Sequence, residues 1–292
     1  MIIVQLIGGL GNQMFQYAIG RRLAILKETD LKFDISFFKN YKNRKYDLSC
    51  FNIIEDFASS KEIYRLKGPD GKRIPRKIFK IINKIKPYHK RSYIMERHYY
   101  FDPDILKVSN DVYLEGYWQS EKYFKEIEDI IRSEFKIKYE PDSVNKKIGS
   151  LILGLQSVSI HIRRGDYIAD PNIYKVHGIC PLEYYNAAIE KISKIIKNPH
   201  FFIFSDDPEW VKNNLKIDHP TTFIIGNLGN KDYEDLRLMS LCKHHIIGNS
   251  SFSWWGAWLS ENPGKIVIAP KKWFNDQRIN TNDLIPESWH RI

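Results

Sequence analysis

The sequence predicts an α/β fold in which the second half of the chain is a parallel sheet with helices on both faces. Two observations support this prediction: short apolar runs recur along the second half, and helical patterns lie between them. The apolar runs occupy residues 158–162, 201–204, 222–225, 245–247 and 266–268. A third observation is the length of 292 residues, which is enough for two domains. We expect these domains to span 1–150 and 151–292.

The helices between the strands have recognisable starts. Pro181 opens a pattern that continues to about Lys197 with apolar residues on one face. Asp207 and Pro208 are typical of a helix start, because aspartate caps the first turn and proline fits its first position. Further helices are expected over about 232–242 and from Ser250 or Ser251 onward.

The first half begins with a predicted strand over 2–7, a glycine-rich turn and a helix over about 14–27. Gly9 and Gly11 match the first two glycines of a G-x-G-x-x-G dinucleotide fingerprint, but Met14 replaces the third. The turn is therefore either a phosphate-binding loop before a helix or a tight turn that needs glycine only for its backbone angles. This start also favours a first strand over a signal peptide.

Composition excludes several classes of protein. No apolar run approaches the ~20 residues that a membrane-spanning helix needs. The three cysteines, Cys50, Cys180 and Cys242, form no C-x-x-C pair, which argues against a zinc site and for a reducing compartment. The only D-x-D motif, Asp102-Pro103-Asp104, lies in the irregular middle of the chain, so we interpret it as a turn and not as a metal site.

The net charge of +10 is concentrated between Lys67 and Arg97, where eleven lysines and arginines face only Asp70 and Glu96. This concentration suggests an acidic partner, and no nucleic-acid-binding signature accompanies it. Over 74–91 apolar residues recur among the basic ones, which is typical of a helix lying on an anionic membrane. The alternative is a helix docked on its own domain with a solvated basic face.

Polar side chains follow four of the predicted strands. Because the carboxyl ends of parallel strands meet at one edge of a sheet, we expect these side chains to line one crevice. The four sets are His161, Arg163, Arg164 and Asp166; Ser205, Asp206 and Asp207; Gly226 and Asn227; and Gly248, Asn249, Ser250 and Ser251.

This set of side chains suits a nucleoside diphosphate. The Arg163 guanidinium and the helix start at Ser250–Ser251 can bind a pyrophosphate, since both present N–H donors to phosphate oxygens. Asp206 or Asp207 can accept the N1–H and the exocyclic amine of guanine, whereas the alternative role of Asp207 is helix capping. The alternative for the arginines is an ion pair with an aspartate.

Five ordered segments resemble the α-1,2-fucosyltransferases of glycosyltransferase family 11, across nearly the full length of the chain. They cover residues 8–17, 116–124, 161–167, 204–207 and 248–258, with the sequences GGLGNQMFQY, GYWQSEKYF, HIRRGDY, FSDD and GNSSFSWWGAW. The resemblance implies a two-lobed GT-B-like fold with a parallel-sheet nucleotide-binding domain. It also implies metal-independent, inverting transfer of L-fucose from GDP-fucose to O2 of a terminal galactose on a glycan.

The resemblance further implies which residues contact the donor. Arg163 would contact the diphosphate, and the first glycine-rich turn would close over the donor from the other lobe. The donor-binding set is Gly9, Gly11, Asn12, Gln13, His161, Arg163, Asp206, Asp207, Asn249, Ser250 and Ser251. No metal or other cofactor is implied, and the expected location is cytoplasmic, with contact to the inner face of the membrane through 74–91 as an option.

Inversion needs one displacement step, ideally with a carboxylate that takes the proton of the acceptor hydroxyl. Asp166 and Asp170 are candidates because they follow the end of the strand, although Asp166 could instead pair with Arg163 or Arg164. Two alternatives to the fucosyltransferase remain open at this point. One is a glycosyltransferase that uses another GDP-sugar, and the other is a carbohydrate- or nucleotide-binding protein without turnover.

Overall fold

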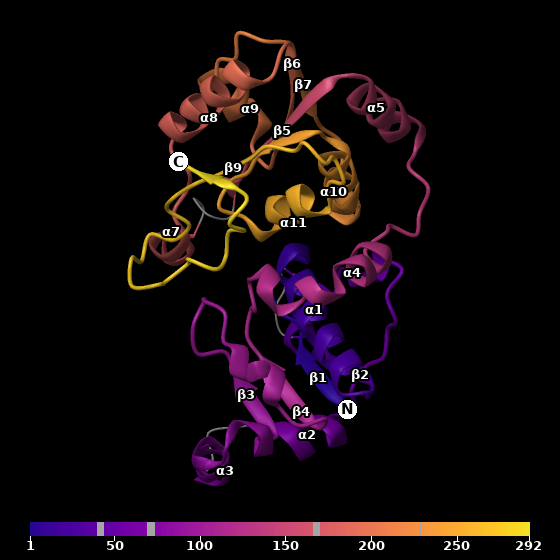
Figure 1. Cartoon of the computed structure of the whole chain (residues 1–292), viewed down its shortest axis with the longest axis vertical. Helices are drawn as coiled ribbons and strands as arrows, with labels where there is room; N and C mark the ends of the chain where they lie inside the picture. The colour runs from indigo at the N-terminus through magenta and orange to yellow at the C-terminus, as the bar shows by residue number, and fades with distance from the viewer. Residues whose placement is uncertain (40–43, 69–73, 166–169, 228) are drawn as a thin grey trace. The chain divides into compact units, whose positions relative to one another are not determined.

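The computed structural model describes residues 1–39, 44–68, 74–165, 170–227 and 229–292. The chain forms two compact units, shown in Figure 1. Unit 1 comprises Met1–Lys136 and Asn280–Leu284, and unit 2 comprises Ile137–Ile279 and Ile285–Ile292. The division after Lys136 comes earlier than the expected boundary at 150, because the helix over 143–154 packs in unit 2.

Unit 1 is built on a four-stranded parallel sheet in the order β2-β1-β4-β3. The strands are β1 (Ile2–Gln5), β2 (Leu31–Asp34), β3 (Tyr93–Met95) and β4 (Val112–Glu115). The α-helices are α1 (Leu10–Leu26), α2 (Ser60–Lys67), α3 (Ile74–Ile85) and α4 (Glu128–Glu134). A capping box between Ser59 and Glu62 starts α2.

The first turn differs from the sequence prediction. Strand β1 ends at Gln5, and α1 begins at Leu10 with Gly9 as its N-cap, so Gly11, Asn12 and Gln13 belong to the helix and not to a loop. The glycines masked this early start, because glycine has a low helix propensity. Gly8 has a φ of +76°, and a Cβ placed on it would lie 2.5 Å from Nδ2 of Asn12.

Unit 2 is built on a six-stranded parallel sheet in the order β10-β9-β8-β5-β6-β7. The strands are β5 (Gln156–Ile162), β6 (Pro199–Ser205), β7 (Thr221–Ile224), β8 (His244–Ile246), β9 (Val267–Ala269) and β10 (His290–Arg291). The helices are α5 (Ser143–Gly154), α7 (Pro171–His177), α8 (Leu182–Ile195), α9 (Pro208–Asn214), α10 (Asp232–Leu241) and α11 (Ser251–Leu259). The five predicted strands and the helices between them are confirmed.

Both faces of this sheet are covered, as the alternation along β6 shows. Phe201 and Ile203 point to one face and join the core that contains Ile192 of α8. Phe202 and Phe204 point to the other face and join the core that contains Leu238 of α10. Burial of each phenylalanine is worth about 1.5–3 kcal/mol, so the two layers fix the strand register. The paired strands β5 and β6 place Ile162 opposite Ser205, which aligns their carboxyl ends.

Candidate functional site

The carboxyl ends of β5 and β6 bring together two of the polar sets that the sequence predicted at one edge. Nη1 of Arg163 lies 3.0 Å from Oδ2 of Asp206. Asp206 also accepts hydrogen bonds from the backbone N–H groups of Arg164 (2.8 Å) and Gly165 (3.0 Å). The Arg163 side chain remains 26% exposed, so its guanidinium can still meet a ligand. The ion pair that the sequence left open is therefore made with Asp206.

Arg164 has a different environment from its neighbour. Its guanidinium carbon lies 3.4 Å from the ring centre of Trp210, and its Nε donates to Asp207 over 3.4 Å. Asp207 also accepts the backbone N–H of Trp210 and so caps α9, as the sequence suggested. Arg164 is thus held flat on α9 by stacking and by charge.

Gly165 is required by close packing at this strand end. A Cβ placed on it would lie 2.8 Å from Oδ2 of Asp206, closer than real Cβ contacts allow. Glycine therefore lets the backbone N–H groups after Arg163 approach the carboxylate. Both oxygens of Asp206 accept hydrogen bonds within this loop. To accept two hydrogen bonds from guanine, Asp206 would have to give up one of these bonds, and the guanine contact stays a prediction.

His161 is buried in β5, and its ring lies 5.9 Å from that of Phe252. Burial, with a smaller contribution from Arg163, lowers the pKa of His161 to about 3. The imidazole is therefore neutral near pH 7 and supplies no charge to a phosphate. Within the described residues its Nδ1 makes no hydrogen bond, which leaves one buried ring nitrogen for a ligand or a water molecule.

The end of β8 lies against the end of β5. A Cβ placed on Gly248 would lie 3.0 Å from the carbonyl oxygen of His161, so this third polar set joins the first two at the edge. Ser250 is the N-cap of α11 and is buried, but its side chain makes no capping hydrogen bond. Ser251 is half-buried and begins the helix.

Asn249 contacts backbone carbonyl groups of two loops. Its Nδ2 lies 3.0 Å from the carbonyl oxygen of His177 and 3.2 Å from those of Gly178 and Trp273. The amide thus joins the segment after α7 to the segment after β9. Donor binding by Asn249 stays a prediction, and the structure supports a positioning role.

The fourth polar set follows the edge strand β7, and its Asn227 contacts two helices. Asn227, after β7, pairs its side-chain amide with that of Asn145 on α5 and with Asp235 on α10. It therefore fastens two helices to the edge strand. Asp170 is half-buried and directly precedes α7, whereas Asp166 lies outside the described residues. The catalytic roles of both aspartates stay predictions.

In unit 1 the glycine-rich turn is fixed by buried amides. Nε2 of Gln13 donates to the carbonyl oxygens of Gly8 and Lys45, and its Oε1 accepts the N–H of Asp47. These bonds hold the turn to the segment at 45–47. Gly9 and Gly11 lie at the start of α1, and Gly11 is buried. This architecture accounts for Gln13 without a ligand, so its donor contact stays a prediction.

Asn12 joins two family motifs that sequence reasoning had treated separately. Its Oδ1 accepts a hydrogen bond of 2.8 Å from Nε2 of Gln119, and Nε2 of Gln16 donates to the carbonyl oxygen of Gly116. These contacts follow from the pairing of β1 with β4, which places both motifs at the same sheet edge. The only sequence signal for this cluster was the motif at 116–120 itself.

Glu96 is a member of this cluster that the sequence did not single out. It accepts the backbone N–H groups of Tyr117 (2.6 Å) and Trp118 (2.9 Å), and Trp118 has a φ of +58°. Burial raises the pKa of Glu96 to about 7, against the opposing effect of these two bonds. The carboxyl group thus holds the turn at 116–118 in its unusual backbone conformation.

The D-x-D motif begins a short 3₁₀ helix and not the simple turn that the sequence predicted. Asp102 caps the short helix over 103–107 by accepting the N–H of Asp104 and also accepts the hydroxyl of Tyr88, while Asp104 pairs with Lys107. Among the described residues, no group of three or more histidines, cysteines or acidic residues is placed to hold a metal ion. In the same part of the chain, no helix is long and apolar enough to cross a membrane.

The motifs at these two sheet edges agree with a comparison against known families. The model of "Glycosyl transferase family 11" matches residues 1–292. The chain belongs to glycosyl transferase family 11. The match extends over both units, so the edge of β5, β6 and β8 and the cluster around Asn12 are parts of one glycosyltransferase.

Two curated relatives from Escherichia coli cover nearly the whole of this glycosyltransferase. A protein named alpha-1,2-colitosyltransferase is 37% identical over 297 residues, covering 100% of this chain and 99% of its own. O-antigen biosynthesis glycosyltransferase WbnK is 35% identical over 303 residues, covering 97% of both chains. A mutant of Arabidopsis thaliana FUT1, solved in complex with GDP, is 12% identical with a TM-score of 0.54, covering 99% of this chain and 75% of that one. The predicted α/β, GT-B-like fold is confirmed.

Proposed function

We propose that this glycosyltransferase transfers L-fucose from GDP-fucose to O2 of a terminal galactose on an oligosaccharide or polysaccharide, with inversion and without a metal ion. Family membership and the five motifs shared with α-1,2-fucosyltransferases support the proposal. The observation that carries it is Arg163, whose partly exposed guanidinium is held at the end of β5 by Asp206. A cation fixed at this edge suits a nucleotide diphosphate leaving group.

The leaving GDP gains negative charge as the bond to fucose breaks, so a donor fixed in advance stabilises the transition state more than the ground state. A guanidinium has five N–H donors, so Arg163 can keep Asp206 and still bind a phosphate oxygen. The first turn of α11, which begins at Ser251 with Ser250 as its N-cap, is the second source of N–H donors in this proposal. His161 is neutral and would serve the nucleoside by hydrogen bonding through its free ring nitrogen.

The acceptor side of the reaction needs a proton acceptor or an already polarised hydroxyl. In an inverting transfer, O2 of galactose attacks the anomeric carbon of fucose from the face opposite GDP, and the hydroxyl proton passes to a base. Asp166 and Asp170 are the proposed candidates because they follow the strand end that carries Arg163. The GDP-sugar substrate also suggests a cytoplasmic place of action, which is part of the proposal.

GDP-colitose is a second candidate donor. It is favoured by one observation: a relative named alpha-1,2-colitosyltransferase is 37% identical to this chain. Colitose is fucose without the hydroxyl group at C3, so the two donors differ by one polar group. A site that hydrogen-bonds this hydroxyl would leave a buried polar group unpaired with colitose and discriminate by up to ~10⁴-fold. A site without such a contact would accept both sugars.

The deciding experiment compares GDP-fucose and GDP-colitose on a β-galactoside acceptor, with the matching 2-deoxygalactoside as control. We expect faster turnover with GDP-fucose, an α-1,2 linkage in the product by NMR, and no product from the control. A higher kcat/KM for GDP-colitose would identify GDP-colitose as the preferred donor. Formation of product from the 2-deoxygalactoside would exclude O2 as the hydroxyl that receives the sugar. Binding without turnover on any galactoside would favour the carbohydrate-binding protein.

The role of Arg163 is tested in the same assay. Arg163→Ala should lower kcat by about 10²-fold or more, because the leaving diphosphate loses a charged donor. Arg163→Lys should recover little, since lysine lacks the planar fork. Arg278→Ala, which removes an exposed arginine paired with Asp276 in the same unit, is the control and should keep full activity. A lysine variant with near-normal kcat would show that the planar guanidinium is not required.

Metal independence is part of the proposal and has its own test. Arg163 and the N–H groups of α11 can offset the charge of the diphosphate, so activity should survive EDTA. Restoration of activity only by added Mg²⁺ or Mn²⁺ after chelation would overturn this part and leave the donor assignment to be judged separately.

A further inference from the structure

Helix α3 carries an apolar face that is open to solvent. Ile78, Ile81, Ile82 and Ile85 are 50%, 62%, 47% and 77% exposed. Their spacing of i, i+3, i+4 and i+7 places them on one side of the helix. Single exposed apolar residues are common on protein surfaces, but four on one helical face make a patch that indicates an interaction.

The same helix is attached to unit 1 through a different face. Phe79 packs on the core that contains Tyr93 and Tyr113, and the Asn83 side chain is buried. Nδ2 of Asn83 donates to the carbonyl oxygen of Tyr93, and Oδ1 accepts the N–H of Ser92. Docking on the protein therefore relies on Phe79 and Asn83 and leaves about half or more of each isoleucine exposed. A docked helix and a membrane-binding helix are thus compatible interpretations.

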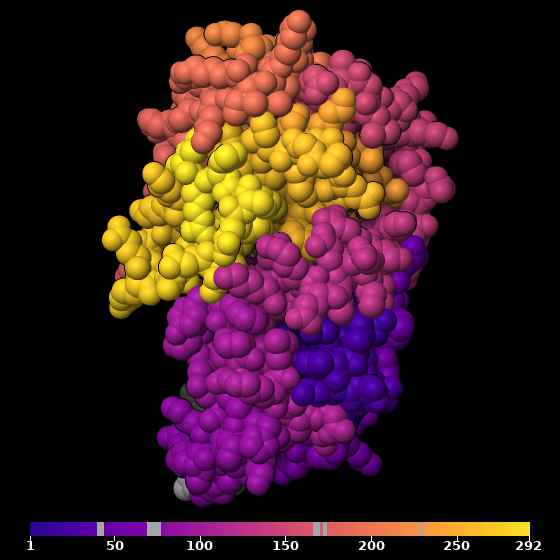
Figure 2. Space-filling model, viewed as in Figure 1, coloured from indigo at the N-terminus to yellow at the C-terminus, as the bar shows by residue number. Residues whose placement is uncertain are grey.

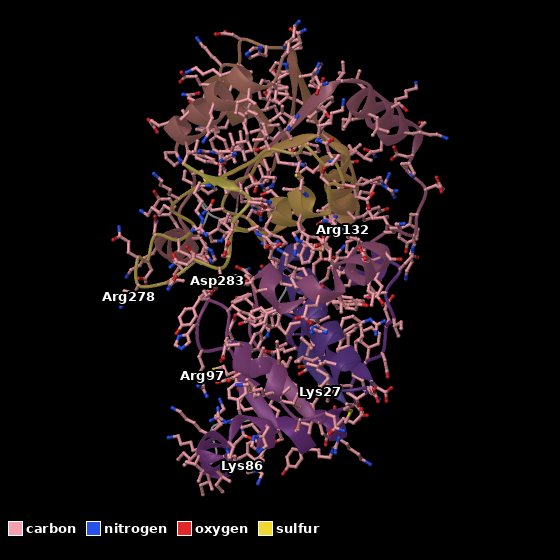
Figure 3. All side chains as sticks on the ribbon, in the orientation of Figure 1. Lys27, Lys86, Arg97, Arg132, Arg278 and Asp283 are labelled. Carbon is pink, nitrogen blue, oxygen red and sulfur yellow. The ribbon has the colours of Figure 1, made fainter. Side chains whose placement is uncertain are left out.

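Basic side chains border the isoleucine face. Lys77, Lys84 and Lys86 are exposed, and Figure 3 labels Lys86 beside α3. The sequence from Lys77 to Met95 contains no aspartate or glutamate. Lys80 is different, because its ammonium lies 5.6 Å from the ring centre of Tyr93 and belongs to the docked side. Figure 2 shows this violet part of the chain at the outer surface of unit 1.

We propose that this face of α3 binds the surface of an anionic lipid membrane. The isoleucines would enter the boundary between headgroups and acyl chains, while the lysines at the margins meet lipid phosphates. Each lysine near such a surface contributes about 1 kcal/mol, so both parts are needed for stable but reversible binding. The proposal goes beyond the glycosyl transfer and does not depend on the donor or the acceptor.

Charge argues against the other occupants of this face. A second copy of the chain would bring two sets of lysines together, and like charges across an interface are unfavourable. Nucleic acid would pair with the lysines but would leave the isoleucines exposed to water. An anionic bilayer complements both the apolar centre and the basic margin.

Vesicle sedimentation of the full-length protein tests the proposal. We expect binding to vesicles that contain phosphatidylglycerol, little binding to pure phosphatidylcholine, and loss of binding as salt is raised, because salt screens the lysines. No binding to anionic vesicles at low ionic strength would overturn the proposal. Equal binding to neutral vesicles would overturn the role of the lysines.

Two matched pairs of variants locate the surface. The double variant Ile81→Gln with Ile85→Gln should weaken vesicle binding at least tenfold, whereas Leu153→Gln with Ile195→Gln, exposed residues of unit 2, should not. Charge reversal of Lys77, Lys84 and Lys86 to Glu should abolish binding, whereas reversal of the exposed Lys147, Lys197 and Lys216 changes net charge equally and should preserve most of it.

Turnover of a soluble acceptor verifies that each variant is folded. Unchanged vesicle binding in the α3 variants would refute α3 as the contact. A change in the sedimentation coefficient of the lipid-free isoleucine variant would instead identify a second copy of the chain as the occupant of the face.

Discussion

Arg163 and Arg164 are neighbours in the sequence but have different surroundings in the structure. Arg163 faces Asp206 and remains partly exposed, whereas Arg164 is stacked on Trp210 and paired with Asp207. The sequence predicted that an arginine would follow the strand and bind a diphosphate. It could not predict which aspartate meets which arginine, because that depends on the register of β5 with β6.

This division leads to different expectations for the two aspartates. Asp206→Asn should lower kcat about as much as Arg163→Lys, because an amide group cannot accept from Arg163 and two backbone N–H groups at once. Asp207→Asn should leave kcat nearly unchanged and cost at most about 1 kcal/mol, since asparagine also caps helices. Steady-state kinetics and thermal melts distinguish them. A rise in KM for GDP-fucose without a fall in kcat in Asp206→Asn would instead support the guanine contact.

His161 makes stability depend on pH in a defined direction. Its pKa is about 3 in the folded protein and near 6.5 in the unfolded chain, so only the unfolded chain takes up a proton between these values. The contribution of His161 to the free energy of unfolding is full above pH 6.5. It is lost as pH falls, by up to about 1.4 kcal/mol per pH unit.

The variant His161→Gln removes this titration. Between about pH 7.5 and pH 5, it should lose about 2 kcal/mol less stability than the parent, because the other buried histidines titrate in both proteins. Urea or thermal unfolding at both pH values measures the difference. An equal loss in the two proteins would indicate that His161 takes up its proton while folded.

At the scale of elements, unit 2 was largely predictable, because five of its six strands lie at apolar runs that end in turn signals; β10 has no such run and was not predicted. β6, for example, is buried on both faces and ends at Ser205, two residues before the capping Asp207. Unit 1 was less predictable, because the glycines hid the start of α1. The contact between Asn12 and Gln119 crosses 107 positions and depends on strand order, which local patterns do not encode.

Gly165 tests the loop that joins these elements. Gly165→Ala places a methyl group against the Asp206 carboxylate, so this carboxylate or the loop must shift, which disturbs the ion pair with Arg163. We expect a fall in kcat of at least tenfold with a small change in stability. Gly154→Ala is the control, because no heavy atom lies within 4 Å of its added Cβ. Wild-type kcat in Gly165→Ala would show that Asp206 does not need this close approach.

At the scale of the whole molecule, the path of the chain differs from the simple division that the sequence suggested. The chain does not pass once from unit 1 to unit 2, because Asn280–Leu284 returns to unit 1. The return was unpredictable because the segment is short and carries no periodic apolar pattern, although Leu284 within it is buried. The α5 helix also belongs to unit 2, since the Asn145–Asn227 amide pair fastens it there.

Asp283, labelled in Figure 3, ties the return segment to other parts of unit 1. Its carboxylate accepts from the Lys122 ammonium (2.6 Å) and from the backbone N–H of Phe101 (3.0 Å). Asp283→Ala leaves that partly buried N–H without its acceptor, at a cost of about 1–3 kcal/mol. Local opening should therefore become easier in unit 1 and stay unchanged in unit 2.

Hydrogen–deuterium exchange measures this directly. In Asp283→Ala, peptides that cover 97–107 and 118–127 should exchange faster, while peptides from β5 and β6 should match the parent. Asp276→Ala is the matched control, because it removes an aspartate paired with exposed Arg278 from the same connection but on the side of unit 2. Faster exchange at 97–107 in both variants, or in neither, would show that Asp283 does not hold the returning chain to unit 1, and that the backbone of 280–284 packs there without it.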